Sequence, residues 1–329
     1  MRVREKIVES LSRISILREY YTGLATIFTL HRVHPFEEGK LSVNENMKIT
    51  PEFLENIILE LKSKDYSFIN LDRLHDILQK NENAEKQIVF TFDDGYKDNY
   101  DLAYPILKKY NIPFTIYITT SFPESTAVLW WYAIEDLIVD NDEILLSNNE
   151  KYICQTQEQK VDTFLNIRKK IISLDPEILL ERLESLLTNY EINWIKKCNE
   201  LALSWSQIEE LSRDNLVTIA GHTMNHYPLN RLSESEIRIE IKQANKLIET
   251  KIGKSVNHIA YPFGGRSEIN QREINVVKGL GLKTAVTTRN GNIYPEHKGF
   301  LQSLPRIMLT EGFKVNDIGR IRRTRIATL

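Results

Sequence analysis

Short apolar segments alternate with amphipathic segments along most of the chain. The apolar segments are rich in β-branched and aromatic residues, which is typical of buried strands. Apolar positions also recur at helical spacing between them, most clearly over 234–251 and 267–279. Strands that alternate with helices predict the α/β class, with a parallel sheet and crossover helices. Eight strands are predicted, enough to favour closure into a barrel: 24–30, 67–71, 87–92, 113–118, 216–220, 257–261, 283–287 and 304–308.

One long segment, residues 125–205, interrupts this alternation. It has helical periodicity and no predicted strand, and it is too long for a plain loop. We therefore expect a helical insertion that leaves the barrel after the fourth strand. The predicted organisation is an N-terminal helix over 1–22, a barrel formed by 23–124 and 206–312, the insertion over 125–205, and a basic C-terminal tail over 313–329.

The composition is that of an ordinary globular protein. Hydrophobic residues make up 42% and charged residues 27% of the 329 residues, which excludes a disordered chain. The formal net charge of −2 gives no general attraction to nucleic acid, so no nucleic-acid partner is expected. The basic cluster over 320–325 is interpreted either as a solvated chain end or as a peripheral contact with phosphate or lipid head groups.

The location in the cell is predicted from cysteine usage and from the apolar segments. Cys154 and Cys198 are too few for a disulfide framework and suit a reducing compartment. The longest apolar runs fall short of a membrane span, and no export signal is evident. We expect a cytoplasmic protein, either free or peripheral at the inner face of the membrane.

Two adjacent carboxylates follow the predicted strand 87–92. Asp93 and Asp94 lie where that strand ends, and in a barrel the carboxyl ends of the strands form the face on which active sites are built. Neighbouring like charges raise the cost of ionisation, so a bound cation is the natural compensator. Asp-Asp-Gly is also good turn sequence, and this stretch alone leaves both interpretations open.

A pair of histidines follows the predicted strand 216–220. His222 and His226 are four residues apart, so a helical turn would place both imidazoles on one face, where they suit one metal ion. The segment Tyr261–Gly265 lies at a third strand end. Its proline and glycines favour a tight loop that can expose a backbone N–H to a ligand.

The segments TFDDGY, HTMNH and YPFG, in this order and at strand ends, closely resemble the NodB-like polysaccharide deacetylases of carbohydrate esterase family four. The resemblance covers about 24–310 apart from the insertion. It implies a distorted (β/α)7-8 barrel, a divalent metal, usually zinc, and hydrolysis of an N-acetyl group on an amino sugar. By position, it implies that the metal ligands are Asp94, His222 and His226, that the general base is Asp93, and that the backbone N–H of Phe263 holds the oxyanion.

The chain departs from the usual pattern of that family in its second half. The late Leu-x-His segment, which supplies the usual general acid, has no histidine here and contains Arg306 instead. The arginine that normally precedes the third motif is Ala260, and the fourth, tryptophan-bearing motif is not evident near 284–290. We expect Arg306 to pair with Asp93 and keep it ionised, the alternative being an ordinary surface ion pair.

His31 is the predicted replacement for the missing acid. It ends the first strand in a segment that resembles the N-terminal Tyr-His-x-Val strand of a deacetylase branch in which this histidine comes from the front of the chain. A closed barrel makes its first and last strands neighbours, so the replacement is geometrically reasonable. His34 is the competing candidate. His75 and His297 are interpreted as structural, and His258 lies at the wrong end of its strand.

The preferred function is a metal-dependent hydrolase that removes an N-acetyl group from an amino sugar of a cell-envelope polysaccharide or of its lipid-linked precursor. Alternatives are a deformylase or deacylase of another sugar amide, and a non-catalytic glycan-binding protein on the same scaffold. A glycoside hydrolase using Asp93 and Asp94 is disfavoured, because adjacent carboxylates point in different directions rather than flanking a bond. The aromatic run 130–132 is expected either to stack on sugar rings or to pin the insertion to the barrel.

Overall fold

The structure is a computed structural model, and it describes residues 22–320. The predicted N-terminal helix over 1–22 lies outside this range except for its last residue, and so does the basic cluster over 320–325 except for its first. Among the described residues, no helix is both long enough and apolar enough to cross a membrane.

Seven parallel strands close into a barrel, as the strand and helix pattern predicts. The ring order is β1-β12-β11-β10-β9-β6-β5, and pairing of β1 with β5 over their full length closes it. The strands are β1 (Ala25–Leu30), β5 (Gln87–Phe92), β6 (Phe114–Ile118), β9 (Val217–Gly221), β10 (His258–Ala260), β11 (Thr284–Asn290) and β12 (Leu304–Met308).

The expectation of a strand over 67–71 is wrong in extent. Only β4 (Ser67–Phe68) forms there, and it pairs with the start of β5 outside the closed ring. The strand ends early because the side chain of Asn70 accepts a hydrogen bond from the backbone N–H of Arg73, which begins helix α5 at Leu71.

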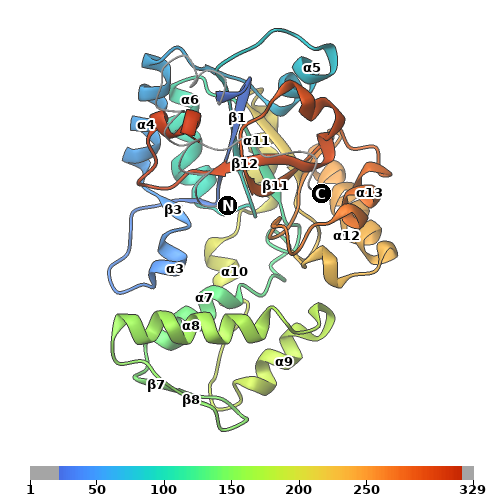
Figure 1. Cartoon of the computed structure of the whole chain (residues 1–329). Helices are drawn as coiled ribbons and strands as arrows, with labels where there is room; N and C mark the ends of the chain where they lie inside the picture. The colour runs from blue at the N-terminus through green and yellow to red at the C-terminus, as the bar shows by residue number, and fades with distance from the viewer. Residues whose placement is uncertain (1–21, 321–329) are drawn as a thin grey trace, which may run out of the picture.

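Helices cover the outside of the barrel (Figure 1). The covering helices are α4 (Pro51–Ser63), α5 (Leu71–Lys80), α6 (Tyr104–Lys109), α11 (Trp205–Arg213), α12 (Glu234–Ile252) and α13 (Gln271–Lys278). The π-helical turn η1 (Asn99–Ala103) runs into α6. The predicted helix over 234–251 is confirmed as α12, which begins with a capping box at Ser233. The helix expected over 267–279 begins only at Gln271, after a bend.

Shorter elements connect the strands and helices of the barrel. They are β2 (Arg32–Val33), α3 (Ser42–Glu45), β3 (Lys48–Ile49), and the 3-10 turns η3 (Leu229–Arg231), η4 (Pro295–Gly299), η5 (Leu301–Ser303) and η6 (Val315–Arg320). The packed unit extends past the expected boundary at residue 312. Phe313 packs edge-on against Phe28, with 5.3 Å between ring centroids, and Val315 and Ile318 are buried against the barrel.

Alternating residues of the strands form two different cores. One set, including Phe28 and Phe90, points outward and packs under α4, α6 and α11. The other set points into the barrel and consists of Ile27, Val89, Tyr117, Ala220, Ala260, Val286 and Leu304. The inward set fixes which residues at the strand ends face the mouth of the barrel.

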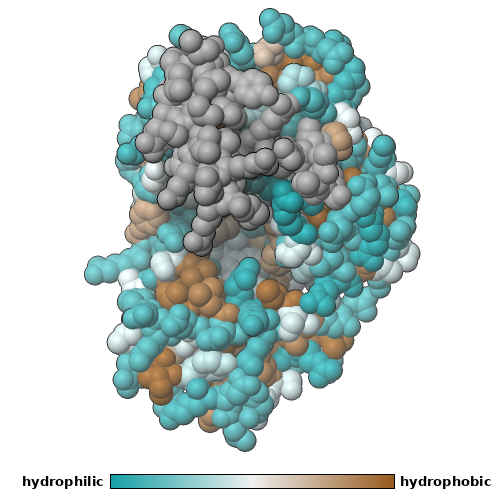
Figure 2. All heavy atoms as spheres, in the orientation of Figure 1, coloured by the Kyte–Doolittle hydropathy of each residue, from teal (hydrophilic) through white to brown (hydrophobic). Residues whose placement is uncertain are grey.

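The segment between β6 and α11 forms a separate lobe at one end of the barrel (Figure 1). It contains α7 (Trp130–Val139), α8 (Gln157–Ile171), the turn η2 (Pro176–Ile178), α9 (Leu179–Leu186) and α10 (Lys196–Leu201). The lobe has its own apolar core, built around Trp130, Ile134 and Phe164. On the face seen in Figure 2, hydrophilic residues cover most of this lobe and hydrophobic ones form small separate patches.

The expectation of an insertion without strands is wrong. An antiparallel hairpin, β7 (Glu143–Leu145) and β8 (Lys151–Ile153), lies between α7 and α8. Each strand has three residues, and only Ile144 of β7 is buried, so there is too little alternation for the sequence pattern to reveal them.

Candidate metal centre and active site

Inward-facing positions bring four polar side chains to one end of the barrel. His31 comes four residues after Ile27, and Asp93 comes four residues after Val89, so each lies on the same face as that inward-pointing residue. His222 stands two residues after Ala220, and Arg306 two residues after Leu304. Because side chains alternate along a strand, the period that fills the barrel with apolar groups also directs these groups into its mouth.

Asp94, His222 and His226 form a candidate metal-ligand cluster among the described residues. Their ligand atoms all lie within 4.8 Å of one another. The Nε2 atoms of His222 and His226 lie 3.2 and 3.3 Å from Asp94 Oδ1. The structure therefore brings together the three residues that the resemblance assigned to a metal.

The backbone that presents these ligands is a loop and not the helical turn expected from the four-residue spacing. Residues after β9 form bends, and Thr223 and His226 have left-handed backbone angles, with φ of 66° and 58°. Asp94 is also left-handed, with φ of 75°. The side chain of Glu240 on α12 accepts hydrogen bonds from the backbone N–H groups of Met224 and Asn225, which holds the loop in place.

The donor groups fit a divalent metal. The ring of His222 is 2.7 Å from the carbonyl of Ala260 through Nδ1, so Nδ1 carries a hydrogen and Nε2 of the neutral ring is available as a metal ligand. Asp94 Oδ1 is buried and has no hydrogen-bond partner among the described residues. Burial opposes its ionisation, but the charge and hydrogen bonds of the two imidazoles, when these are protonated, outweigh this effect and hold the pKa of Asp94 well below its ordinary value. One carboxylate and two imidazoles suit zinc and leave coordination positions free.

Asp93 and Arg306 form a buried two-point ion pair beside this cluster. Nη1 and Nη2 of Arg306 donate to Oδ1 and Oδ2 of Asp93 at 2.7 and 2.6 Å. Arg306 also donates to Thr91 Oγ1 and to the carbonyl of Thr287, and its side chain is fully buried. The expected pairing is present, and the alternative of a surface ion pair is wrong. Burial opposes ionisation of Asp93, but the guanidinium charge outweighs it, so the pKa of Asp93 is lowered.

His31 lines the same cavity as Asp93 and Asp94. Its Nδ1 is buried without a hydrogen-bond partner among the described residues. Burial lowers the pKa of His31, and the charges of Asp94 and Asp93 only partly offset this effect. The competing candidate, His34, does not line the cavity.

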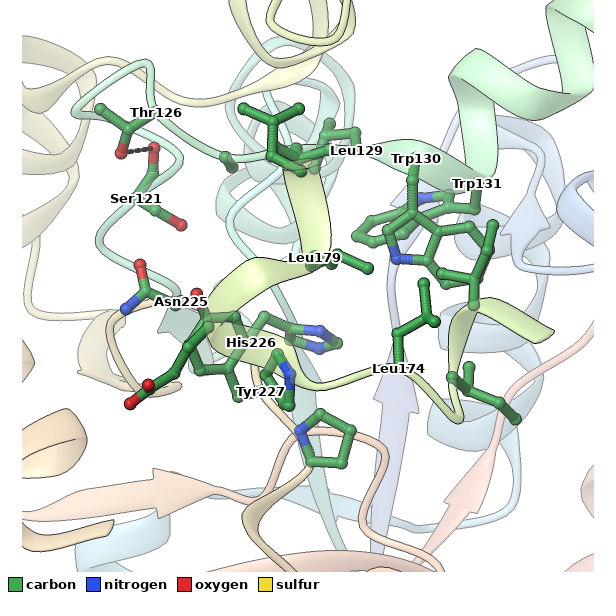
Figure 3. A pocket seen from close by; sticks show the side chains of 18 of the residues that line it. Ser121, Thr126, Leu129, Trp130, Trp131, Leu174, Leu179, Asn225, His226 and Tyr227 are labelled. Atoms are coloured by element: carbon green, nitrogen blue, oxygen red, sulfur yellow. Dashed lines mark hydrogen bonds between the residues drawn. The ribbon is translucent and has the colours of Figure 1, made fainter. Parts of the chain in front are cut away.

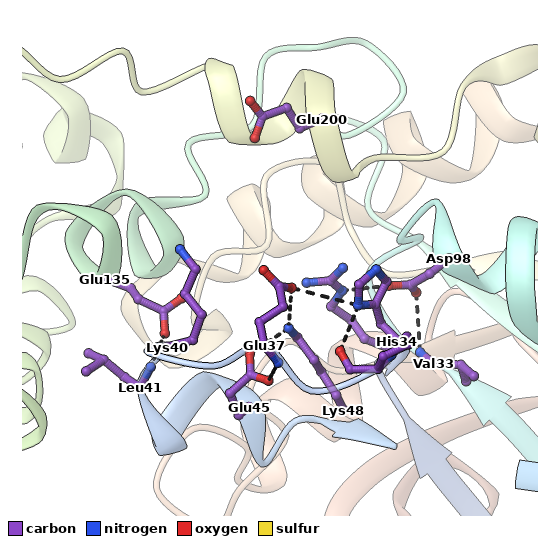
Figure 4. A network of polar contacts seen from close by, with 12 residues as sticks. Val33, His34, Glu37, Lys40, Leu41, Glu45, Lys48, Asp98, Glu135 and Glu200 are labelled. Atoms are coloured by element: carbon purple, nitrogen blue, oxygen red, sulfur yellow. Dashed lines mark hydrogen bonds and ion pairs between the residues drawn. The ribbon is translucent and has the colours of Figure 1, made fainter. Parts of the chain in front are cut away.

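His34 belongs to a different polar network (Figure 4). Its ring lies 3.8 Å from Glu37, which also pairs with Lys48 at 2.9 Å. Nearby, Arg32 donates to Asp98 at 2.7 Å. This network joins the segment after β1 to η1 and to β3, and it fixes the strand end from which His31 projects.

The third motif forms the expected tight loop after β10. Phe263 is left-handed, with φ of 60°, and its carbonyl accepts a hydrogen bond from Thr288 Oγ1. Gly264 is required here, because a Cβ at this position would lie 2.9 Å from the backbone N of Thr288. Within the described chain, the N–H of Phe263 donates to no protein acceptor. Its ring centroid lies 5.0 Å from that of His226.

The site opens into a cavity of about 440 Å³ that also receives residues from the insertion. Trp130, Trp131 and Tyr132 line it, and Trp130 is at the same time part of the insertion core. The aromatic run therefore both anchors the insertion and faces the site. Arg168 of α8 also lines the cavity, although no motif predicts it there. No pattern in the sequence brings that residue near the strand-end motifs.

A second, mainly apolar cavity of about 250 Å³ adjoins the first. Trp130, Trp131, His226 and Phe263 line both cavities. In Figure 3, Leu174 and Leu179 of the insertion line this space together with Asn225 of the β9 loop.

The remaining predicted positions lie away from the mouth. His258 and His297 are buried at the opposite end of the barrel, and His75 lies beside Asp76 on α5. Their positions agree with the structural interpretation given to them.

Comparisons of sequence and of structure with known proteins match the same family. The sequence model described as "Polysaccharide deacetylase" matches residues 80–285, which is more than half of the chain. A putative polysaccharide deacetylase, YxkH, of Bacillus subtilis is 22% identical over 74% of this chain. The match spans 58% of that relative, which is less than two thirds of its length. A poly-beta-1,6-N-acetyl-D-glucosamine N-deacetylase of Staphylococcus aureus is 22% identical over 81% of this chain and 69% of its own.

Among solved structures, the deacetylase PplD of Streptococcus pyogenes in complex with acetate has the same fold. It aligns with a TM-score of 0.58 and 20% identity, over 88% of this chain and 93% of its own. The barrel, the strand-end motifs and the matching family model lead to one assignment. The chain belongs to the polysaccharide deacetylase family.

Proposed function

We propose that this protein is a metal-dependent hydrolase that removes the N-acetyl group from an amino sugar of a cell-envelope glycan. The observation that carries the proposal is the convergence of Asp94, His222 and His226 beside the buried Asp93–Arg306 pair, in one cavity at the barrel mouth. Membership of the polysaccharide deacetylase family supports the same chemistry.

We propose zinc as the metal, held by Asp94, His222 and His226, because two imidazoles and a carboxylate are a common donor set for catalytic zinc. When bound, such an ion lowers the pKa of water and polarises the substrate carbonyl. The hydrogen bond from His222 Nδ1 to the carbonyl of Ala260 keeps Nε2 available as a ligand.

The residues around the cluster have separate roles in the proposed reaction. Asp93 takes the proton of the attacking water, and Arg306 keeps it ionised and fixes its orientation. The free N–H of Phe263 donates to the oxygen that becomes negative in the transition state. His31 donates a proton to the sugar nitrogen, because an unprotonated amine is a poor leaving group.

The substrate and the location follow as further proposals. The Staphylococcus aureus relative is named for poly-beta-1,6-N-acetyl-D-glucosamine, and an N-acetylglucosamine glycan is accordingly the first substrate to test here. A lipid-linked precursor of such a glycan would suit a protein at the inner face of the membrane. The two buried, unpaired cysteines support a reducing, cytoplasmic location, which cell fractionation would test.

The decisive experiment measures acetate and free amine after zinc-loaded protein is incubated with N-acetylglucosamine oligomers. We expect acetate release that stops when a chelator removes the metal. Glycan binding without acetate release by the zinc-loaded protein would favour a non-catalytic binding protein. New reducing ends without acetate would favour a glycoside hydrolase.

One observation favours a second candidate function, a deacylase that takes acyl groups longer than acetyl. The apolar cavity of about 250 Å³ touches His226 and Phe263, so it lies next to the proposed position of the acyl group. N-butyryl and N-acetyl forms of one amino sugar would separate the two functions. Faster release of butyrate would favour the deacylase, and release of acetate alone would exclude it.

A further inference from the structure

A third hollow adjoins the cavity of about 440 Å³ that contains Asp94, called the metal cavity below, and its lining is polar and basic. It is an open groove of about 710 Å³ between helix α8 of the insertion and the segments that follow β9 and β10. Its polar lining consists of Tyr152, Asn166, Arg168, Lys169, Lys170, Ser173, Asn230, Arg231, Ser267 and Glu268.

The charge of this groove is strongly positive. Arg168, Lys169 and Lys170 are consecutive on α8, and Arg231 in η3 lines the groove from the barrel. Glu268 is the one acidic residue of the described lining, and it accepts a hydrogen bond from Ser267. The chain as a whole carries a net charge of −2, so this concentration of cations is local and not a property of the entire surface.

Three of the four cations lack an ionic partner among residues 22–320. Lys170 pairs with Glu150 at 2.9 Å. In the described part of the chain, no carboxylate lies within 4 Å of the charged groups of Arg168, Lys169 or Arg231. Cations held close together without counter-charges repel one another, and an anion between them would relieve this repulsion.

The groove adjoins the cavity that holds Asp94, and the two spaces share lining residues. Arg168 lines both of them, and so does Phe263, whose ring lies against His226. A saccharide whose amide reaches Asp94 and His226 can therefore extend past Phe263 into the basic groove. Arg168 stands at the junction of the two spaces and would meet the neighbouring part of the substrate first.

The groove also has consequences for selectivity. Removal of an acetyl group from an amino sugar leaves an ammonium group, and a row of unpaired cations repels a glycan with several such groups. The same cations attract a phosphate or carboxylate, and arginine binds both in two-point geometry. The charge pattern thus disfavours a neutral homopolymer that becomes polycationic as it is processed.

We propose that the groove binds an anionic substituent, a phosphate or a carboxylate, next to the amino sugar whose acyl group is removed. This inference rests on the proposed function and narrows it to an anionic saccharide. Arg168 and Arg231 determine the specificity, one at the junction with the metal cavity and one on the opposite wall of the groove.

The test compares three matched disaccharides as substrates of the zinc-loaded full-length protein: neutral, phosphorylated and uronate-containing, each with one N-acetylglucosamine. We expect kcat/KM to be about tenfold higher for at least one anionic substrate than for the neutral one, and this preference to shrink in high salt. The arm with the larger preference identifies phosphate or carboxylate as the source of the charge. Equal values for all three substrates at low salt would overturn the proposal.

Matched variants assign the effect to the groove. In Arg168→Gln/Arg231→Gln, we expect the ratio of anionic to neutral kcat/KM to fall about tenfold. The control Lys242→Gln/Lys246→Gln removes two positive charges from exposed positions on α12 outside the groove, and it should keep the ratio. An equal fall in both variants would mean that only the overall charge matters, which contradicts the proposal.

A binding measurement separates this inference from the proposed function. Calorimetric titration of the same disaccharides gives an affinity even if no acetate is released. Anion preference without turnover would contradict the hydrolase while supporting the groove. Turnover without anion preference in either measurement would support the hydrolase and refute the groove.

Discussion

Histidines lie at both ends of the barrel, and their surroundings differ. At the base, His297 accepts a hydrogen bond from the backbone N–H of Tyr294 through Nδ1. His258 bonds Thr284 through Nδ1 and lies 3.4 Å from Asp72, which Lys283 neutralises at 2.5 Å. At the mouth, His222 and His226 instead face one carboxylate oxygen that has no hydrogen-bond partner in the described chain.

The difference shows that a structural histidine is distinguished from one in a candidate active site by the polar atoms around it, and not by its residue type. Both ends combine histidine, aspartate and a cation. At the base, the charges compensate one another within the protein. At the mouth, Asp93 neutralises Arg306, whereas Asp94 and its two imidazoles have no such cation beside them in the described chain and form a candidate metal site.

The largest expected effect comes from removing the carboxylate at the mouth, and the matching variant at the opposite end is its control. Asp94→Ala should abolish metal binding and lower kcat/KM about 1,000-fold or more, because one of three ligands is lost. Asp72→Ala should keep metal and activity and reduce stability by only about 1 kcal/mol, since Asp72 is partly exposed. Metal analysis, acetate release and urea unfolding measure these changes. If Asp94→Ala retained zinc, Asp94 would not be a metal ligand and the contrast between the two ends of the barrel would be wrong.

Asp93→Asn should separate metal binding from proton transfer within the mouth. The side chain keeps its size, so zinc should still bind, whereas kcat should fall about 100- to 10,000-fold because the amide cannot accept the proton of water. Metal content and initial rates are measured on the same preparation. Full activity of this variant would remove Asp93 from the mechanism.

His297, at the end of the barrel opposite the site, should make the stability of the fold sensitive to acid. Burial lowers the pKa of His297 to about 4, whereas the unfolded chain binds this proton near pH 6.5. Between these values the unfolded state binds more protons, so stability falls as the pH falls, by up to about 3 kcal/mol at pH 4. Urea unfolding at several pH values measures this loss. A much weaker pH dependence in His297→Gln is expected, and an unchanged one would show that His297 is not its source.

His31→Gln should have the smallest effect of the series, a decrease of about 10- to 100-fold in kcat. A general acid must be protonated, so the wild-type rate falls as the pH rises through the pKa of His31. That alkaline decrease should be missing in the variant. His34→Gln is the matched control and should keep both rate and profile, because His34 lies outside the cavity. A profile of His31→Gln identical to the wild type would remove its assignment as the acid.

The barrel and the strand-end motifs could be predicted because local patterns encode both. Asp93 and Asp94 follow a strongly apolar strand, and the ends of parallel strands meet at one face of a barrel. The expected count of eight strands was one too many for the ring, because the cap at Asn70 ends β4 after two residues. The loop form of 222–226 was also missed, since a spacing of four residues does not reveal the left-handed backbone at Thr223.

The contribution of the insertion could not be predicted in the same way. Arg168 reaches the site only because α8 packs against α7 through the insertion core, which involves contacts between distant parts of the chain. A run of three basic residues on a helix is normally a solvated surface. The packing of the insertion against the barrel turns this run into one side of a groove.

The pairing of β1 with β12 places the earliest and the latest strands of the described chain next to each other. His31 and Arg306 come from these two strands, and both lie outside the part that matches the family model, residues 80–285. On the ribosome, the three proposed metal ligands emerge well before Arg306. The nascent polypeptide thus contains all the proposed metal ligands before it can orient Asp93, and the proposed activity begins only once β12 has paired with β1.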